Sequence, residues 1–241
     1  MTEVDIFIPC FIDQLFPETG FNMVKVLEKA GCKVHYNPNQ TCCGQPAFNA
    51  GYWKEMDDVG KKFLADFANS DRYVVGPSGS CVGFVRNFYG TLYANTPVHN
   101  YYKGLRKNLF EFSEFMVDVL KVDNLGGKLK AKITYHDACG ALRECKIKEA
   151  PRRLLNNIEG LEIVEMVDSE TCCGFGGTFA VKFEPISTGM ANSKVNNAIA
   201  TGAEYIVSTD YSCLMHLQAY IDKQQKPIKV LHIADLLAMS I

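Results

Sequence analysis

Short apolar runs alternate with amphipathic stretches along the whole chain. In the first third, runs at 4–9, 33–37 and 72–76 have the length and the content of β-branched and aromatic residues typical of buried strands. Between them, residues 18–30 and 53–68 place apolar side chains at helical spacing. Strands that alternate with helices indicate parallel pairing through crossover connections, so this pattern predicts an α/β fold.

The rest of the first half predicts three more elements. A short helix is expected to begin near Ser80 and Cys81, followed by a strand at 97–100 and a helix over 109–120. Residues 124–128, with two glycines between polar side chains, then form the best candidate for a linker.

After this linker the same order of elements returns. The expected elements are a strand at 132–137, a helix at 149–157, a strand at 161–166, a helix at 186–201, a strand at 204–209, a helix at 212–223, a strand at 228–232 and a helix at 233–240. The sequence therefore predicts two pseudo-symmetric halves, residues 1–125 and 126–241. Each half is expected to be a small parallel sheet flanked by helices, in a Rossmann-like arrangement.

The cysteines follow this repeat. Each half has one cysteine after its first strand, a Cys-Cys-Gly doublet after its second and one cysteine after its third. The two sets are Cys10, Cys42, Cys43 and Cys81, and Cys139, Cys172, Cys173 and Cys213. Equivalent cysteines are 129, 130, 130 and 132 residues apart. Because ligands bind at the carboxyl ends of parallel strands, we expect each quartet to converge at that edge of its sheet.

Four converging thiolates are typical of iron–sulfur clusters or of zinc. Cys81 and Cys213 are expected to begin helices, whose N-terminal dipoles stabilise a thiolate. Two other interpretations of the cysteines are weaker. Disulfides belong mainly to small secreted domains, and a role as buried apolar filler does not account for the duplicated spacing.

Composition and charge restrict the classes of partner. The chain has 241 residues, of which 47% are hydrophobic and 22% charged, with a formal net charge of −2 and a pI of about 6.2. With no basic run, neither nucleic acid nor an anionic membrane surface is an expected partner. The acidic start at Met1–Asp5 and the lack of an apolar stretch of about 18 residues favour a cytoplasmic protein without direct membrane insertion.

Six segments around the cysteines carry a family resemblance. They are Ile8–Asp13, Gln40–Pro46, Pro77–Cys81, Tyr135–Cys139, Cys172–Gly177 and Asp210–Leu214. These segments resemble the cysteine-rich CCG-domain family, which includes the cysteine-rich subunit of heterodisulfide reductase and the iron–sulfur subunit of glycolate oxidase. They are most similar to the lactate-utilisation protein A branch of that family, and the resemblance covers essentially the whole chain.

The resemblance implies an iron–sulfur electron-transfer subunit of a cytosolic complex that oxidises L-lactate to pyruvate. It implies up to two clusters per chain, of the [4Fe–4S] type, held by the eight repeated cysteines, with zinc as the alternative occupant. Lactate-utilisation proteins B and C are the implied partners. No flavin or nicotinamide site is recognisable in the sequence, so we expect a partner to supply further redox centres, and no catalytic residue is assigned.

The sequence departs from the family pattern in one respect. The full motif ends in Cys-x-x-Cys, whereas this chain has Ser78 and Asp210 where the extra cysteines would stand. Four thiolates per site favour a conventional cluster with a possible oxygen ligand beside it, and disulfide reduction cannot be carried over from heterodisulfide reductase. Two alternatives remain open: a zinc scaffold with four cysteines per site, and a thiol–disulfide oxidoreductase of the heterodisulfide-reductase type.

Several residues near the second quartet are accessory candidates. His136 and Asp137 could act as general acid or base, but hydrogen bonding to a cluster or loop is the favoured role. Cys145 could be a spare ligand or a redox-active thiol, and a passive role is favoured. Asp210 is expected either to lower the potential of a cluster in the second half or to cap the helix that begins near Cys213.

Overall fold

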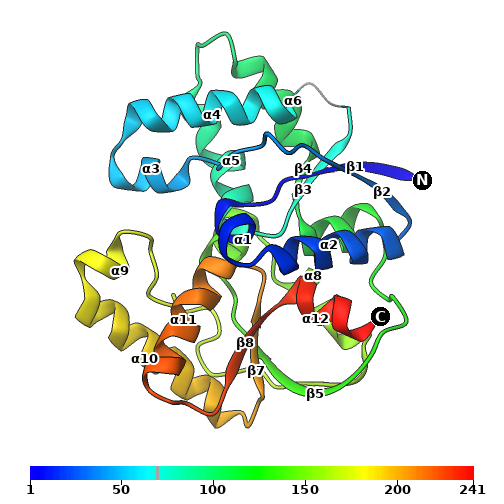
Figure 1. The fold of residues 1–241 in the computed structure, drawn as a ribbon, viewed down its shortest axis with the longest axis vertical. Helices are drawn as coiled ribbons and strands as arrows, with labels where there is room; N and C mark the ends of the chain where they lie inside the picture. Colours follow the sequence, from blue (N-terminus) through cyan, green and yellow to red (C-terminus); the bar gives the residue numbers. More distant parts are fainter. Residues whose placement is uncertain (69–70) are drawn as a thin grey trace.

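Two four-stranded parallel sheets, one in each half of the chain, form the framework of the computed structural model, which describes residues 1–68 and 71–241 (Figure 1). The first sheet contains β1 (Thr2–Ile6), β2 (Cys32–Tyr36), β3 (Tyr73–Gly76) and β4 (Leu109–Glu111). The second contains β5 (Lys128–Tyr135), β6 (Glu159–Ile163), β7 (Tyr205–Ser208) and β8 (Lys229–His232). The strand orders β2-β1-β3-β4 and β6-β5-β7-β8 are the same, which confirms the predicted α/β fold with two similar halves.

Helices connect the strands of each sheet. The first half contains α1 (Cys10–Leu15), α2 (Pro17–Lys29), α3 (Gln45–Ala50), α4 (Trp53–Phe67), α5 (Gly79–Leu92), α6 (His99–Asn108), α7 (Phe112–Glu114) and the π-helical turn η1 (Phe115–Val119). The second contains the π-helical turn η2 (Gly140–Glu144), α8 (Glu149–Asn156), α9 (Phe179–Lys182), α10 (Glu184–Ala200), α11 (Tyr211–Lys223) and α12 (Ile233–Ser240). Among the described residues, none of these helices combines the length and apolarity needed to cross a membrane.

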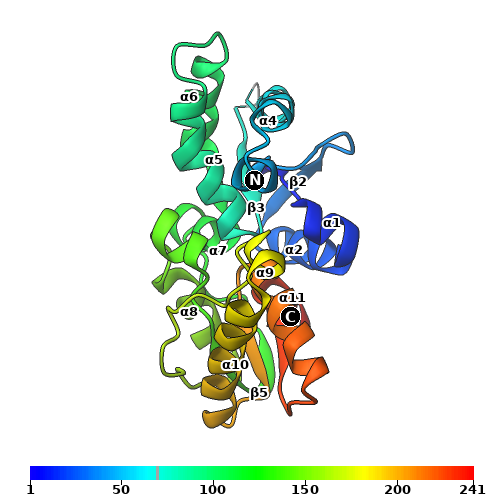
Figure 2. The ribbon, with the colours of Figure 1, turned by 90° about the vertical axis from the view of Figure 1, so that its left-hand side faces the viewer.

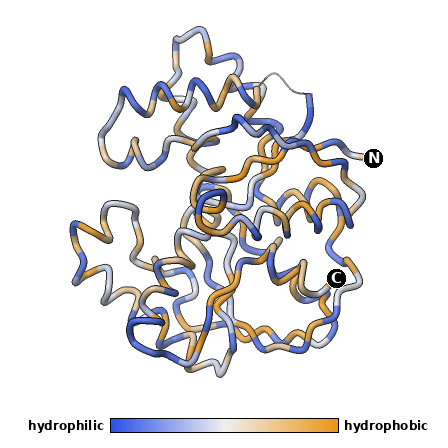
Figure 3. Tube along the Cα trace, viewed as in Figure 1, coloured by the Kyte–Doolittle hydropathy of each residue, from blue (hydrophilic) through white to orange (hydrophobic). Residues whose placement is uncertain are grey.

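Helices such as α4 form because one side of the helix is apolar. In α4, Met56, Phe63 and Phe67 are buried at helical spacing, and polar residues such as Asp58 and Lys61 are exposed between them. Figure 3 shows this as an alternation of hydrophobic and hydrophilic colours along α4. α2 ends just before Gly31, whose φ of +87° is a conformation that glycine adopts without steric cost.

The predicted fourth strand of the first half is wrong. Residues 97–100 do not pair with β3; α6 begins at His99, and the strand that pairs with Val74 and Val75 is β4. Consequently the helix predicted over 109–120 begins only at Phe112, where Glu111 and Glu114 form a capping box. The second half passes from α11 to β8 without an intervening helix, so α6 has no counterpart there.

The two halves pack closely against each other (Figure 2). α12 lies on α2, where Asp235 accepts hydrogen bonds from Thr19 and Asn22, both at 2.9 Å. In the same way, α8 of the second half packs on α7 and η1 of the first. One continuous group of buried apolar side chains includes residues of both sheets. The division at residue 125 therefore stays a prediction.

The contact of α5 with η2 brings the main chains of the two halves close together. A Cβ atom at Gly79 would lie 2.5 Å from the Cβ of Ala141, and one at Gly140 would lie 2.5 Å from the Cα of Ser80. Only glycine fits at these positions, because real Cβ atoms do not approach so closely. This contact brings the start of α5, which carries Cys81, against the segment that follows Cys139.

Candidate metal centres

The first quartet gathers at the carboxyl edge of the first sheet. Cys10 is the first residue of α1, Cys42 and Cys43 lie in the loop after β2, and Cys81 is in the first turn of α5. The sulfurs of Cys10 and Cys42 are 3.6 Å apart. Gly44, with a φ of +86°, turns the chain so that its own N–H donates back to the Cys42 sulfur at 3.4 Å. The glycine after the doublet thus allows two adjacent thiols to share one site.

The second quartet repeats this geometry. Cys139 precedes η2, and Cys213 lies in the first turn of α11. Gly174 has a φ of +98°, and its N–H donates to the Cys172 sulfur at 3.4 Å, as Gly44 does in the first half. The N–H of Phe175 donates to the Cys173 sulfur at 3.5 Å. The repeated spacing in the sequence is therefore a repeated local structure.

Both quartets line a single cavity of about 250 Å³. All eight repeated cysteines contribute to its wall, together with Ser78 and Asp210. The sequence predicts one convergence point per sheet but contains no signal that the two would share a cavity. The packing of α5 on η2 makes this possible, because it places the corresponding edges of the two sheets side by side.

The thiols of each quartet affect one another's protonation. Hydrogen bonds from Cys10 and Cys43 lower the pKa of Cys42 below its usual range, whereas the pKa values of those two neighbours are raised. In the second half the pKa of Cys172 is lowered in the same way by Cys139 and Cys173, whose pKa values are raised. Each quartet thus holds a thiolate with thiol protons beside it that a metal can displace on binding.

All ten cysteines are free thiols. Eight thiols at one cavity, with Cys81 and Cys213 in the first turns of long helices, match the soft sulfur ligands and positive dipole ends that suit iron–sulfur clusters or zinc. The residues present therefore fit such groups.

Ser78 and Asp210 cap the two helices that carry Cys81 and Cys213. The Ser78 hydroxyl accepts a hydrogen bond from the N–H of Cys81 at 3.4 Å. One carboxylate oxygen of Asp210 accepts from the N–H of Ser212 at 3.3 Å and from its hydroxyl at 2.6 Å. The other accepts from the N–H of Ser80 at 2.8 Å. Both side chains therefore have hydrogen-bonding roles at the cavity wall besides any contact with a ligand.

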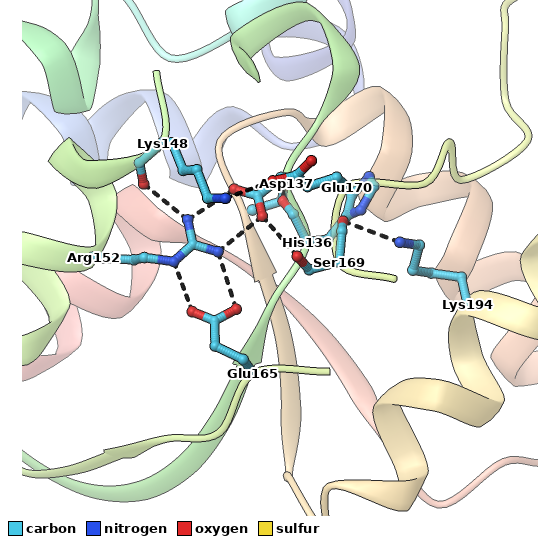
Figure 4. A network of polar contacts seen from close by, with 9 residues as sticks. His136, Asp137, Lys148, Arg152, Glu165, Ser169, Glu170 and Lys194 are labelled. Carbon is cyan, nitrogen blue, oxygen red and sulfur yellow. Dashed lines mark hydrogen bonds and ion pairs between the residues drawn. The ribbon is translucent and has the colours of Figure 1, made fainter. Parts of the chain in front are cut away.

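The side chains of the neighbouring residues His136 and Asp137 lie in different surroundings. Asp137 forms a two-pronged ion pair with Arg152, at 2.8 Å for each oxygen, and accepts a hydrogen bond from Ser169 at 3.0 Å (Figure 4). The His136 ring is fully buried and lies beside the second quartet. One of its ring nitrogens and the sulfurs of Cys173 and Cys213 are all within 4.8 Å of one another. Asp137 thus holds neighbouring segments of the protein together, whereas the His136 ring lies beside the thiols of the second quartet.

The ion-pair network holds the loop that leads to the second doublet. Arg152 also binds Glu165, with its Nε 2.6 Å from one carboxylate oxygen. The buried ammonium of Lys194 donates to the backbone carbonyls of Asp168 and Ser169. Sequence reasoning missed Arg152 and Lys194, because neither the charge pattern nor the spacing indicates that these two cations are largely buried.

The two cysteines outside the repeat lie away from the cavity wall. Cys32 is a buried residue of β2. The Cys145 thiol is also buried, which raises its pKa to about 12, and it contacts the carbonyl oxygen of Gly79 at 3.5 Å where α5 meets η2. Cys145 therefore packs between the halves, and its passive role stays a prediction.

His216 is a further residue near the second site that the sequence pattern does not indicate. Its Nε2 is 3.2 Å from the hydroxyl of Ser187, which itself donates to the carbonyl oxygen of Gly174 at 2.7 Å. This pair fixes the turn directly after the Cys172-Cys173 doublet. Because Ser187 and His216 belong to helices that follow the doublet at a distance in the sequence, their contact leaves no local signal.

Comparisons with known proteins agree with this geometry. The model of the CCG cysteine-rich domain matches the chain twice, over residues 4–86 and 133–218. The chain is 43% identical over 239 residues to lactate utilization protein A from Exiguobacterium sp. (strain ATCC BAA-1283 / AT1b), covering 98% of this chain and 97% of that protein. It is 40% identical over 235 residues to lactate utilization protein A from Geobacillus kaustophilus (strain HTA426), covering 98% of each.

Among solved structures, a hypothetical protein from Helicobacter pylori is similar with a TM-score of 0.60 at 13% identity. The match covers 99% of this chain but only 49% of that one, so this chain spans about half the length of that protein. At this identity the likeness concerns the fold alone. The duplicated domain match and the full-length relatives establish that the chain belongs to the cysteine-rich CCG-domain family and, within it, to the family of lactate utilization protein A.

Proposed function

We propose that this protein is an iron–sulfur electron-transfer subunit of a cytosolic complex that oxidises L-lactate to pyruvate. The observation that carries the proposal is the convergence of two thiol quartets on one cavity. The substrate comes from the relatives, whose names assign them to lactate utilization.

Cys10, Cys42, Cys43 and Cys81 would hold one cluster, and Cys139, Cys172, Cys173 and Cys213 the other. When bound, [4Fe–4S] clusters would accept and donate single electrons. The protein's contribution is to supply the thiolates, to direct the N-terminal dipoles of α5 and α11 at them, and to limit access of water through the partly buried positions of the sulfurs.

Oxidation of L-lactate to pyruvate releases two electrons and two protons. The cavity wall is built mainly from cysteines and short polar or aromatic residues, so we assign the chemistry on lactate to a partner with its own redox centre. Lactate-utilisation proteins B and C are the proposed partners, and this chain would take up electrons from that complex.

Metal analysis of anaerobically purified protein tests the proposal. We expect iron and acid-labile sulfide for about two clusters per chain, with absorbance near 400 nm. Replacing the first doublet, as Cys42→Ser with Cys43→Ser, is expected to halve the iron content. The matched control is Cys32→Ser, which changes a buried cysteine outside both quartets and is expected to leave the iron content unchanged.

Two results would contradict the proposal. Stoichiometric zinc without sulfide in protein never exposed to air would favour the four-cysteine zinc scaffold. Turnover of a small-molecule disulfide by the metal-free protein would favour a thiol–disulfide oxidoreductase. The lactate assignment has its own test: when the proposed partners are added, L-lactate is expected to bleach the absorbance near 400 nm, and D-lactate serves as the control.

A further inference from the structure

The His136 side chain is a fully buried polar group whose described polar contact is with the second quartet, through the thiol of Cys213. Among the described residues neither ring nitrogen has a well-aligned hydrogen bond to oxygen or nitrogen. Buried imidazoles nearly always have a strong partner for at least one nitrogen, so a buried ring that contacts only thiols indicates a ligand that completes it.

The backbone fixes the direction of this ring. His136 follows directly after β5, where its N–H donates to the carbonyl oxygen of Val207 at 2.8 Å and its own carbonyl accepts from the Ser208 hydroxyl at 2.9 Å. Its neighbour Asp137 is held by Arg152 (Figure 4). With the main chain held on both sides, the ring stays beside the quartet, with a nitrogen within 4.8 Å of the sulfurs of Cys173 and Cys213.

The described residues of the first half place no such donor beside the first quartet. The residue equivalent to His136 is Phe7, whose N–H donates to the carbonyl oxygen of Val75 at 2.9 Å, as His136 does to Val207. Phe7 packs edge-on against Phe63, with ring centroids 4.8 Å apart. The two sites therefore match in their thiols and differ in that the second has an imidazole where the first has a phenyl ring.

We propose that one ring nitrogen of His136 is a metal ligand at the second site. This inference rests on the proposed function, because it concerns the metal group that the quartet would hold. The ligand donors of the second site would then be sulfur and nitrogen, whereas those of the first would be sulfur alone. The second site would then offer an imidazole in addition to its four thiolates, so the metal groups of the two sites are expected to differ in their ligands.

Isotope labelling tests the ligand directly. Protein labelled with ¹⁵N only in histidine, reconstituted anaerobically with iron and sulfide and then reduced, is measured by pulsed electron paramagnetic resonance. We expect a strongly coupled ¹⁵N signal that is lost in His136→Phe, the variant that installs the first-half residue. His216→Phe is the matched control, because His216 also lies beside the Cys172-Cys173 turn but is hydrogen-bonded to Ser187, and the signal is expected to persist.

Absence of a strongly coupled ¹⁵N signal in the wild type, or its persistence in His136→Phe, would overturn the proposal. The wild-type measurement does not depend on the folding of a variant. If the protein takes up no iron or sulfide, the proposed function fails, and cobalt(II) added to the metal-free protein decides the ligand question. Two spectrally distinct cobalt sites that become alike in His136→Phe would support the nitrogen ligand, and two sites already alike in the wild type would refute it.

Discussion

The carboxylate of Asp210 accepts a hydrogen bond from the backbone N–H of Ser80 at 2.8 Å, although the two residues belong to different halves of the protein. The other oxygen of the same carboxylate caps α11 through Ser212. A single side chain therefore binds the N-terminal turns of both α5 and α11, the helices that carry Cys81 and Cys213. The position where the family motif would have a cysteine has become a link between the two sites.

Variants at Asp210 distinguish the helix-capping role of this side chain from the effect of its negative charge. Asp210→Ala removes the acceptor for both helices, and we expect a loss of about 1–2 kcal/mol in the free energy of unfolding, measured by urea denaturation of the metal-free protein. Asp210→Asn keeps a good capping residue and is expected to retain most of the stability. Equal losses in the two variants would show that the charge, rather than the hydrogen bonds, stabilises the contact.

The same charge is expected to affect both clusters. The sequence predicts an influence of Asp210 on the cluster of the second half alone, but the carboxylate reaches the start of α5 as well as that of α11. Removing a negative charge stabilises the reduced form of a nearby cluster, so Asp210→Asn should raise both potentials. A redox titration followed by electron paramagnetic resonance checks this, and a shift confined to one cluster would contradict it.

Because α5 and η2 pack closely, a side chain added at their contact is expected to destabilise the protein. An added Cβ in Gly79→Ala would meet Ala141 at 2.5 Å, and we expect a loss of about 1–3 kcal/mol in the free energy of unfolding. Gly104→Ala is the matched control, because a Cβ added at this position in α6 has no heavy atom within 4 Å. The control is expected to be neutral or to stabilise by up to about 1 kcal/mol. Similar thermal melting of the two variants would refute the close packing.

Breaking the ion pair between Arg152 and Asp137 is expected to reduce metal binding at the second site only. Arg152→Leu leaves the Asp137 carboxylate buried without its cation, which typically costs about 3–5 kcal/mol. Because the pair also holds the loop before Cys172 in place, the amount of iron bound at the second site is expected to fall, while the amount bound at the first site is expected to stay the same. Arg153→Leu is the control: its pair with Asp123 is largely exposed and should contribute less than about 1 kcal/mol.

The sequence predicts the strands and cysteines that occur in both halves, but it does not predict the contacts that join the two halves. The apolar runs and the cysteine offsets are sufficient for every strand except β4 and for the positions of the cysteines, because those depend on local pattern and on parallel pairing. The strand at 97–100 was wrong because the first half carries the extra helix α6, which the assumption of strict repetition excluded. The shared cavity, the Asp210 link and the His136 contact depend on packing between distant segments, which leaves no periodic signal.

The pKa of the Glu111 carboxyl group is expected to make the free energy of unfolding depend on pH. Its carboxyl group is fully buried where β4 meets α7, and burial raises its pKa from 4.5 to about 7, although hydrogen bonds from Ser113 and Glu114 oppose the shift. One of its oxygens has no hydrogen-bond partner among the described residues. Because the folded state holds this proton more tightly than the unfolded state, the stabilising effect is complete below about pH 4.5 and is lost as the pH rises through 7.

Glu111→Gln isolates this effect, because the amide has nearly the same shape and does not titrate. Between pH 4.5 and 7.5 the wild type is expected to lose about 3 kcal/mol of unfolding free energy relative to the variant. Urea denaturation of both proteins across this range, at constant ionic strength, gives the difference, and contributions from all other groups cancel in it. Parallel stability curves for the two proteins would show that the carboxyl group titrates alike in the folded and unfolded chain, and the buried position assigned to Glu111 would then be wrong.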